Sequence, residues 1–89
     1  MINLSIVIPS FNESKSLPML VKNFSKKLKR KDVELIIVNN GSNDSTQSIL
    51  VSLKKSYNFL KIIKLKKNIG YGNGILQGLK KAKGIFIAW

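Results

Sequence analysis

The sequence predicts a doubly wound α/β fold, a three-layer α/β/α arrangement with a parallel sheet of strand order 3-2-1-4. Four short apolar segments rich in β-branched residues alternate with three longer segments whose apolar residues recur every three or four positions. The connections between these segments are short, as expected for parallel strands joined by right-handed helical crossovers. The first, second and fourth apolar segments are nearly continuous, which is typical of strands covered on both faces.

The strands are expected at residues 4–9, 35–38, 61–65 and 85–89. Lysines interrupt the third of these segments, and charged side chains suit a sheet edge because they block pairing with another chain. In a sheet of this order, ligands bind beyond the carboxyl ends of the first and fourth strands, where the winding reverses. The fourth strand is followed by no helix, so we expect a domain truncated after this strand.

The helices are expected around the apolar positions at 17–28, 49–57 and 75–82. Pro18 fits the first turn of the first helix, where an N–H group has no helical partner. Asp44 is placed to cap the second helix, and Gln47 stands three residues later, which is the spacing of a capping box. Gly84 is placed to end the third helix.

The composition excludes several classes of function. The 89 residues contain no cysteine and no histidine, which excludes a disulfide framework, a thiolate or imidazole metal site, and catalysis by either side chain within them. No apolar run approaches the roughly 20 residues of a transmembrane helix. The start of the sequence has no basic segment before an apolar stretch, unlike a signal peptide, so we expect a cytoplasmic location.

The chain is strongly basic, with 16 Lys and Arg against four Asp and Glu and a formal net charge of +12. Arg30 is the single arginine, whereas surfaces that read nucleobases favour arginine for its planar, bidentate guanidinium. The lysines are spread along the whole sequence, which favours a set of solvated faces. Attraction to an anionic membrane surface, to nucleic acid or to a phosphate-bearing substrate remains open.

Three polar or glycine-rich segments are expected at the carboxyl edge of the sheet: 9–13, 39–46 and 68–75. In the first, Phe11 can stack on a nucleobase and Glu13 can accept hydrogen bonds, or Phe11 packs in the core and Glu13 favours a helix N-terminus. In the second, Asn39 and Asn40 are expected to face the same crevice, where their amides can bond a base edge or a ribose.

The third segment contains glycines that either let the main chain approach a ligand at a helix N-terminus or permit close packing of a strand on a helix. It does not match the dinucleotide-binding pattern G-x-G-x-x-G, because Ile75 stands where the third glycine belongs. No G-x-x-x-x-G-K-[ST] phosphate loop is present either. NAD binding and P-loop chemistry are therefore disfavoured.

In order and spacing, three segments together resemble the N-terminal half of a family 2 glycosyltransferase, particularly of the polyprenyl-phosphate mannose/glucose synthase type. These are IVIPSFNE at 6–13, ELIIVNNGSNDST at 34–46 and the pattern N-x-G-x-G at 68–72. The resemblance extends over 4–89 and implies a Rossmann-like GT-A fold. It also implies that residues 1–89 are the N-terminal part of a glycosyltransferase 2-like domain, without the metal motif and the acceptor-binding half.

The resemblance further implies a site for a nucleotide-diphosphate sugar. Its residues would be Pro9, Phe11 and Glu13 around the nucleoside, Val38 and Asn40 at the base, and Asn68, Gly70 and Gly72 in the wall beside the donor. The chain departs from the family at Asn39 and Asn40, where an Asp pair is usual. An asparagine carbonyl still accepts from a base N–H, but it loses the charge-assisted bond.

A divalent cation, Mg²⁺ or Mn²⁺, is also implied by the resemblance, but the family's Asp-x-Asp ligands follow the fourth strand, beyond Trp89. The carboxylates of the chain are Glu13, Asp32, Glu34 and Asp44, and no pair of them is expected to converge. We therefore expect no metal site and no catalytic residue within the 89 residues, which alone should be inactive.

The predicted function is donor binding in an enzyme that transfers a hexose from UDP or GDP to a lipid-phosphate or saccharide acceptor. The basic surface would suit an enzyme peripheral to the inner face of a membrane. A non-catalytic nucleotide-binding α/β module is the first alternative, and a basic nucleic-acid-binding protein is a weaker one. We also expect self-association, because Phe86 and Trp89 would lack covering elements.

Overall fold

Strands and helices alternate along the chain in the computed structural model, which describes residues 2–27 and 31–88 and, for 85–88, the main chain only. The elements are β1 (Leu4–Ser10), α1 (Leu17–Lys27), β2 (Val33–Asn40), α2 (Thr46–Ser56), β3 (Leu60–Leu65), α3 (Tyr71–Lys81) and β4 (Ile85–Ala88). Trp89 and the side chain of Phe86, on which the expectation of self-association depends, lie outside this description.

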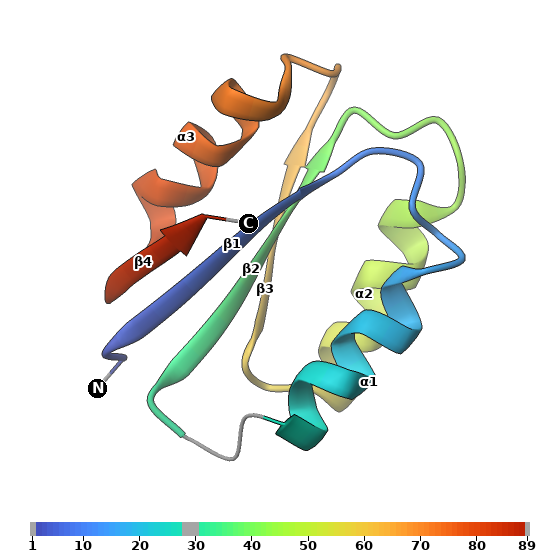
Figure 1. Cartoon of the computed structure of the whole chain (residues 1–89). Coiled ribbons are helices and arrows are strands. Elements are labelled where there is room, and N and C mark those ends of the chain that lie inside the picture. The colour runs from blue at the N-terminus through green and yellow to red at the C-terminus, as the bar shows by residue number, and fades with distance from the viewer. Residues whose placement is uncertain (1, 28–30, 89) are drawn as a thin grey trace.

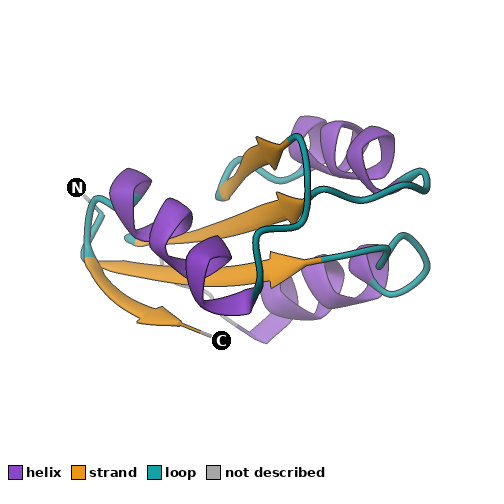
Figure 2. Ribbon diagram, turned by 90° about the horizontal axis from the view of Figure 1, so that it is seen from above, coloured by secondary structure: helices purple, strands orange, loops and turns teal. Residues whose placement is uncertain are grey.

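The strands form one parallel sheet of order β3-β2-β1-β4. The helices α1 and α2 cover one face of this sheet and α3 covers the other, as Figure 1 shows. Seen from above in Figure 2, the sheet twists between these two helical layers. The predicted α/β fold with a parallel sheet is confirmed, and the lysine-containing strand β3 lies at an edge.

The central strand β2 separates two apolar clusters. Side chains alternate along a strand, so Leu35 and Ile37 face α1 and α2, whereas Ile36 and Val38 face α3. Every residue of β2 is buried, because helices cover both of its faces. The helix α3 lies close to the sheet at Gly78, where a Cβ atom would stand 2.2 Å from a methyl carbon of β1.

The predicted capping box of the second helix is wrong. Ser45 is the N-cap residue of α2 and makes no side-chain capping bond. One carboxylate oxygen of Asp44 accepts hydrogen bonds from the Thr46 N–H (2.9 Å) and from the Thr46 hydroxyl. Gln47 instead accepts a hydrogen bond from the Asn39 amide, at 2.8 Å, because the end of β2 lies beside the first turn of α2.

Each of the helices spans 11 residues. Within the segments 2–27 and 31–88, none is long and apolar enough to cross a membrane.

A buried carboxylate joins the strands at the end of the sheet where they begin. Glu34 is almost fully buried, and its Oε2 accepts from the Ser5 hydroxyl at 2.5 Å and from the Lys83 N–H at 2.9 Å. Its Oε1 lies 2.6 Å from the Lys61 ammonium. Ser5 in turn accepts from the Gly84 N–H at 3.1 Å, so one network links β1, β2, β3 and the segment leading into β4.

This network gives the fold a predicted dependence on pH. Burial alone would raise the pKa of the Glu34 carboxyl, but hydrogen bonds from Lys61, Ser5 and the Lys83 N–H outweigh it and hold the pKa below its ordinary value of 4.5. A carboxyl whose pKa is lower in the folded state stabilises the fold above its unfolded pKa. That stabilisation is lost as the pH falls through the folded value.

Glu34→Gln is therefore expected to lower the free energy of unfolding by about 1–3 kcal/mol at pH 7, because its partners lose a charged acceptor. Urea unfolding of both proteins between pH 3 and pH 7 measures this difference. It should begin to shrink below about pH 4.5, where the carboxyl of the unfolded chain becomes protonated, and it should be lost as the pH falls through the lower pKa of the folded state. A difference that stays constant over the whole range would contradict this role of the carboxylate.

Candidate functional site

Three loops, each following one of the strands β1, β2 and β3, lie against one another at the carboxyl edge of the sheet (Figure 1). The Asn12 N–H donates to the Ser42 hydroxyl at 3.0 Å, and the Asn43 N–H donates to the Asn12 side-chain oxygen at 2.8 Å. Gly41, with φ +72°, packs on the loop after β3, where a Cβ atom would stand 2.3 Å from the Asn68 nitrogen. The loops are thus joined by direct contacts.

Asn39 and Asn40 do not face one crevice, and this prediction is wrong. Consecutive residues of a strand point to opposite faces, so Asn39 bonds toward α2 and Asn40 toward α3. The Asn40 side-chain oxygen accepts from the Ile69 N–H, and its Nδ2 donates to the Gly70 carbonyl, both at 3.0 Å. Both asparagines are buried; Asn39 connects the end of β2 to the first turn of α2, and Asn40 connects it to the loop before α3.

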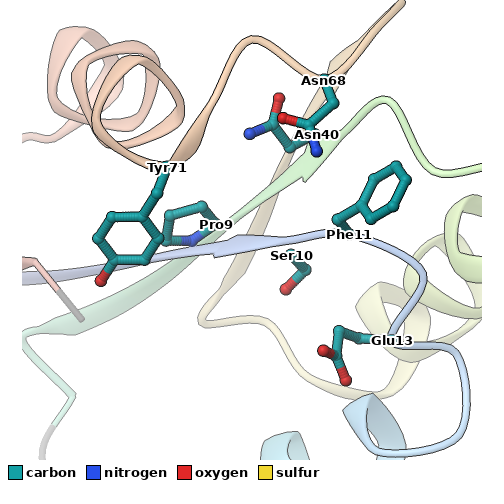
Figure 3. Close-up of a pocket in the computed structure, with 7 residues that line it drawn as sticks. All are labelled: Pro9, Ser10, Phe11, Glu13, Asn40, Asn68 and Tyr71. Carbon is teal, nitrogen blue, oxygen red and sulfur yellow. The ribbon is translucent and has the colours of Figure 1, made fainter.

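A pocket of about 220 Å³ opens where the loops meet (Figure 3). It is lined by Pro9, Ser10, Phe11, Glu13, Asn40, Asn68 and Tyr71. Five of these residues are among the eight that the sequence assigns to a site: Pro9, Phe11, Glu13, Asn40 and Asn68. Residues from three distant parts of the chain therefore meet in one concave surface.

The other three assigned residues do not line the pocket. The Val38 side chain is fully buried in the cluster beneath α3. Gly70 precedes α3 and accepts the hydrogen bond from Asn40, and Gly72 lies in the first turn of that helix.

Two lining residues, Ser10 and Tyr71, are not assigned by the sequence motifs. Ser10 is buried at the end of β1, between two residues that are assigned. Tyr71 is the first residue of α3 and is 59% exposed. An aromatic residue inside a glycine-rich loop at the carboxyl edge is the signal that could have identified it.

The lining combines flat apolar surfaces with a few polar groups. Phe11 is 41% exposed, which excludes the alternative that it packs in the core. Glu13 accepts from the Ser16 hydroxyl at 2.7 Å through one oxygen, and Asn68 accepts from the Gly70 N–H at 2.8 Å. Such a surface suits a planar ring with polar edges. The volume lies below the roughly 300–1,000 Å³ typical of small-molecule sites, so the pocket alone is too small to enclose a ligand of that size.

The described residues do not fit a divalent cation. No group of three or more carboxylates converges within 2–27 and 31–88. Glu13 is the carboxylate at the pocket, whereas Asp44 bonds to Thr46 and Glu34 lies in the network at the opposite end of the sheet. Mg²⁺ is usually bound by one or two carboxylates together with substrate phosphates and waters, so the protein groups at this pocket do not form a metal site by themselves.

The chain folds as a doubly wound α/β domain with a pocket at the carboxyl edge of its sheet, and comparison with known proteins identifies its family. The chain belongs to glycosyl transferase family 2, whose pattern it matches over residues 5–89. The family membership indicated by the sequence motifs is therefore confirmed.

Two curated relatives illustrate the similarity. The chain is 33% identical over 88 residues to dolichyl-phosphate beta-glucosyltransferase ALG5A of Trichomonas vaginalis. It is 32% identical over 83 residues to the prophage bactoprenol glucosyl transferase homolog of Escherichia coli. Each comparison covers 91% of this chain and 27% of the relative, so the chain spans about a quarter of the length of these relatives.

Solved GT-A glycosyltransferases have the same arrangement of strands and helices. S. aureus TarS 1-349 in complex with UDP is 26% identical with a TM-score of 0.82, covering 98% of this chain and 27% of that one. Mannosyltransferase PcManGT from Pyrobaculum calidifontis, in complex with GDP-Man and Mn²⁺, has a TM-score of 0.83 at 18% identity. That comparison covers 91% of this chain and 24% of the other, and it shows similarity of fold.

The contact between the loops generates a prediction at Gly41. Gly41→Ala should lower the free energy of unfolding by at least about 2 kcal/mol, because it combines a left-handed main chain with a clash against main-chain atoms. Gly70→Ala is the matched control, since Gly70 has φ +88° but a Cβ atom there would have no neighbour within 4 Å. With ψ 160° its main chain is also one that favours glycine, so Gly70→Ala should cost about 1–3 kcal/mol from strain alone, less than Gly41→Ala. Equal losses in urea unfolding would contradict the close packing of the two loops.

Proposed function

We propose that the pocket binds the nucleotide of a UDP- or GDP-activated hexose, as the donor-binding part of a glycosyltransferase. The acceptor would be a lipid phosphate or a saccharide. The observation that carries the proposal is the meeting of Phe11, Asn40 and Asn68, from three separate loops, in one pocket of a family 2 chain. The relatives named as dolichyl-phosphate and bactoprenol glucosyltransferases support a lipid-phosphate acceptor. TarS with UDP supports a uridine donor, and the fold shared with a GDP-mannose complex is compatible with guanosine.

The pocket has the properties that a nucleoside requires. Phe11 presents an exposed ring on which a base can stack, and such stacking is worth about 1–3 kcal/mol per base. Around it lie the Ser10 hydroxyl, the Glu13 carboxylate and the Asn68 amide, which can bond the base edge or ribose hydroxyls. With a volume of about 220 Å³, the pocket is expected to hold the nucleoside portion of the donor, with the diphosphate and hexose outside it.

The same residues do not supply catalysis. Glycosyl transfer needs stabilisation of the diphosphate leaving group, commonly by a divalent cation, and a base for the acceptor hydroxyl. Glu13 alone at the pocket provides no metal site. We therefore expect these 89 residues to bind nucleotide in a way that is independent of Mn²⁺ and to transfer no hexose.

Calorimetric titration with UDP, GDP and their hexose derivatives, with and without Mn²⁺, tests the proposal. At least one nucleotide should bind, with an affinity that Mn²⁺ changes by less than about twofold. Phe11→Ala should weaken binding by about tenfold, because a stacking surface is lost. Met19→Ala is the matched control, since Met19 is 61% exposed on α1 and does not line the pocket.

Absence of binding by every nucleotide would contradict the proposal. So would equal affinities for the wild type and Phe11→Ala, because the pocket would then not be the site.

A further inference from the structure

The buried Asn40 amide forms hydrogen bonds with the loop before α3. Asn40 is 3% exposed, and both of its polar side-chain atoms are hydrogen-bonded to the main chain of Ile69 and Gly70 at 3.0 Å. Its Nδ2 would also stand 3.0 Å from a Cβ atom at Gly74, so the side chain is enclosed between this loop and the first turn of α3. The Asn40 side chain therefore fixes the position of the loop that precedes α3.

Tyr71 directly follows Ile69 and Gly70, the two residues that Asn40 binds. Its side chain is 59% exposed, lines the pocket, and makes no side-chain hydrogen bond or ring contact within the described part of the chain. Figure 3 shows Tyr71 and Phe11 on two different sides of the pocket, with Asn40 and Asn68 between them. An unpaired aromatic face at the rim of a pocket gains apolar burial when a ligand covers it.

We propose that Tyr71 is a second aromatic contact for the donor and that Asn40 is its positioning residue. This inference rests on the proposed function. Tyr71 packs its ring against the bound nucleotide, opposite the surface provided by Phe11. Asn40 acts through the main chain of Ile69 and Gly70, which fixes where α3 begins and thus where the Tyr71 ring lies.

The hydrogen bonds explain why an amide at position 40 suits this role. The Ile69 N–H needs an acceptor, and the Gly70 carbonyl needs a donor. A carboxylate satisfies the first but not the second, and it would place a negative oxygen against the Gly70 carbonyl oxygen. Asn40→Asp should therefore release the loop.

The test is calorimetric titration of the 89-residue chain with UDP and GDP. Tyr71→Ala should weaken binding by about tenfold, whereas Tyr71→Phe should stay within about twofold of the wild type, because the ring carries the contact. Leu76→Ala is the matched control, since Leu76 is 54% exposed on the same helix and does not line the pocket. Its affinity should equal that of the wild type.

A double-mutant cycle tests the positioning role of Asn40. Asn40→Asp alone should weaken binding by about tenfold, but in the Tyr71→Ala background it should add less than about twofold, because the residue acts through Tyr71. A purely structural loss would add its full cost in both backgrounds. If Asn40→Asp does not fold, Asn40→Ser, which is neutral and too short to bridge both groups, takes its place with the same expectation.

The outcomes separate the two proposals. A wild type that binds neither nucleotide overturns both the donor site and this inference. A wild type that binds while Tyr71→Ala binds equally well overturns the role of Tyr71 alone. An Asn40→Asp loss that persists in full in the Tyr71→Ala background, or an Asn40→Asp protein that binds as well as the wild type, overturns the positioning role.

Discussion

Two hydrogen bonds connect the end of the central strand to the loop that precedes α3: the buried Asn40 amide accepts from the Ile69 N–H and donates to the Gly70 carbonyl. On the same edge, Gly41 packs directly on the Asn68 main chain, and hydrogen bonds join the loops that follow β1 and β2. A buried amide that lost these partners would leave unpaired polar groups, which cost about 1–3 kcal/mol each. The position of the pocket walls therefore depends on contacts between main chain and buried side chains.

The carboxylates at the two ends of the sheet have different surroundings. At the end where the strands begin, the Glu34 carboxylate is used to bind Ser5, Lys61 and the Lys83 N–H, and it stabilises the fold. At the carboxyl end, Glu13 is the carboxylate at the pocket. This division leaves Glu13 as the carboxylate that lines the pocket, and no group of three or more carboxylates converges among the described residues.

The fold follows from the sequence to a large extent, because strands buried on both faces are nearly continuous in apolar residues. The periodicity of Leu17, Val21 and Leu50 likewise locates α1 and α2. The apolar pattern places the start of α3 four residues too late, since the glycines of its first turn carry no apolar signal although they are helical. Contact with the loop before this helix, and not local propensity, determines where it begins.

The site is predictable where family motifs mark the ends of strands, as at Phe11 and Asn68. Whether a residue belongs to the site is not predictable from the motifs when it depends on which face of a strand the side chain occupies. Asn39 and Asn40 are adjacent in sequence, but Asn39 bonds to α2 on one face of the sheet and Asn40 to the loop before α3 on the other. The Val38 side chain is buried in the core. Tyr71 lines the pocket from the first turn of α3, whose start the apolar pattern does not mark.

The most direct test of the account is to follow backbone amide chemical shifts by NMR while UDP or GDP is added to the isotopically labelled chain. A nucleotide site formed by the three loops predicts changes in all of them at once, at Phe11, Gly41 and Tyr71, and none at the opposite end of the sheet, where Glu34 and Lys83 lie. Changes centred on that opposite end, or confined to a single loop, would contradict a nucleotide site formed by the meeting of the three loops.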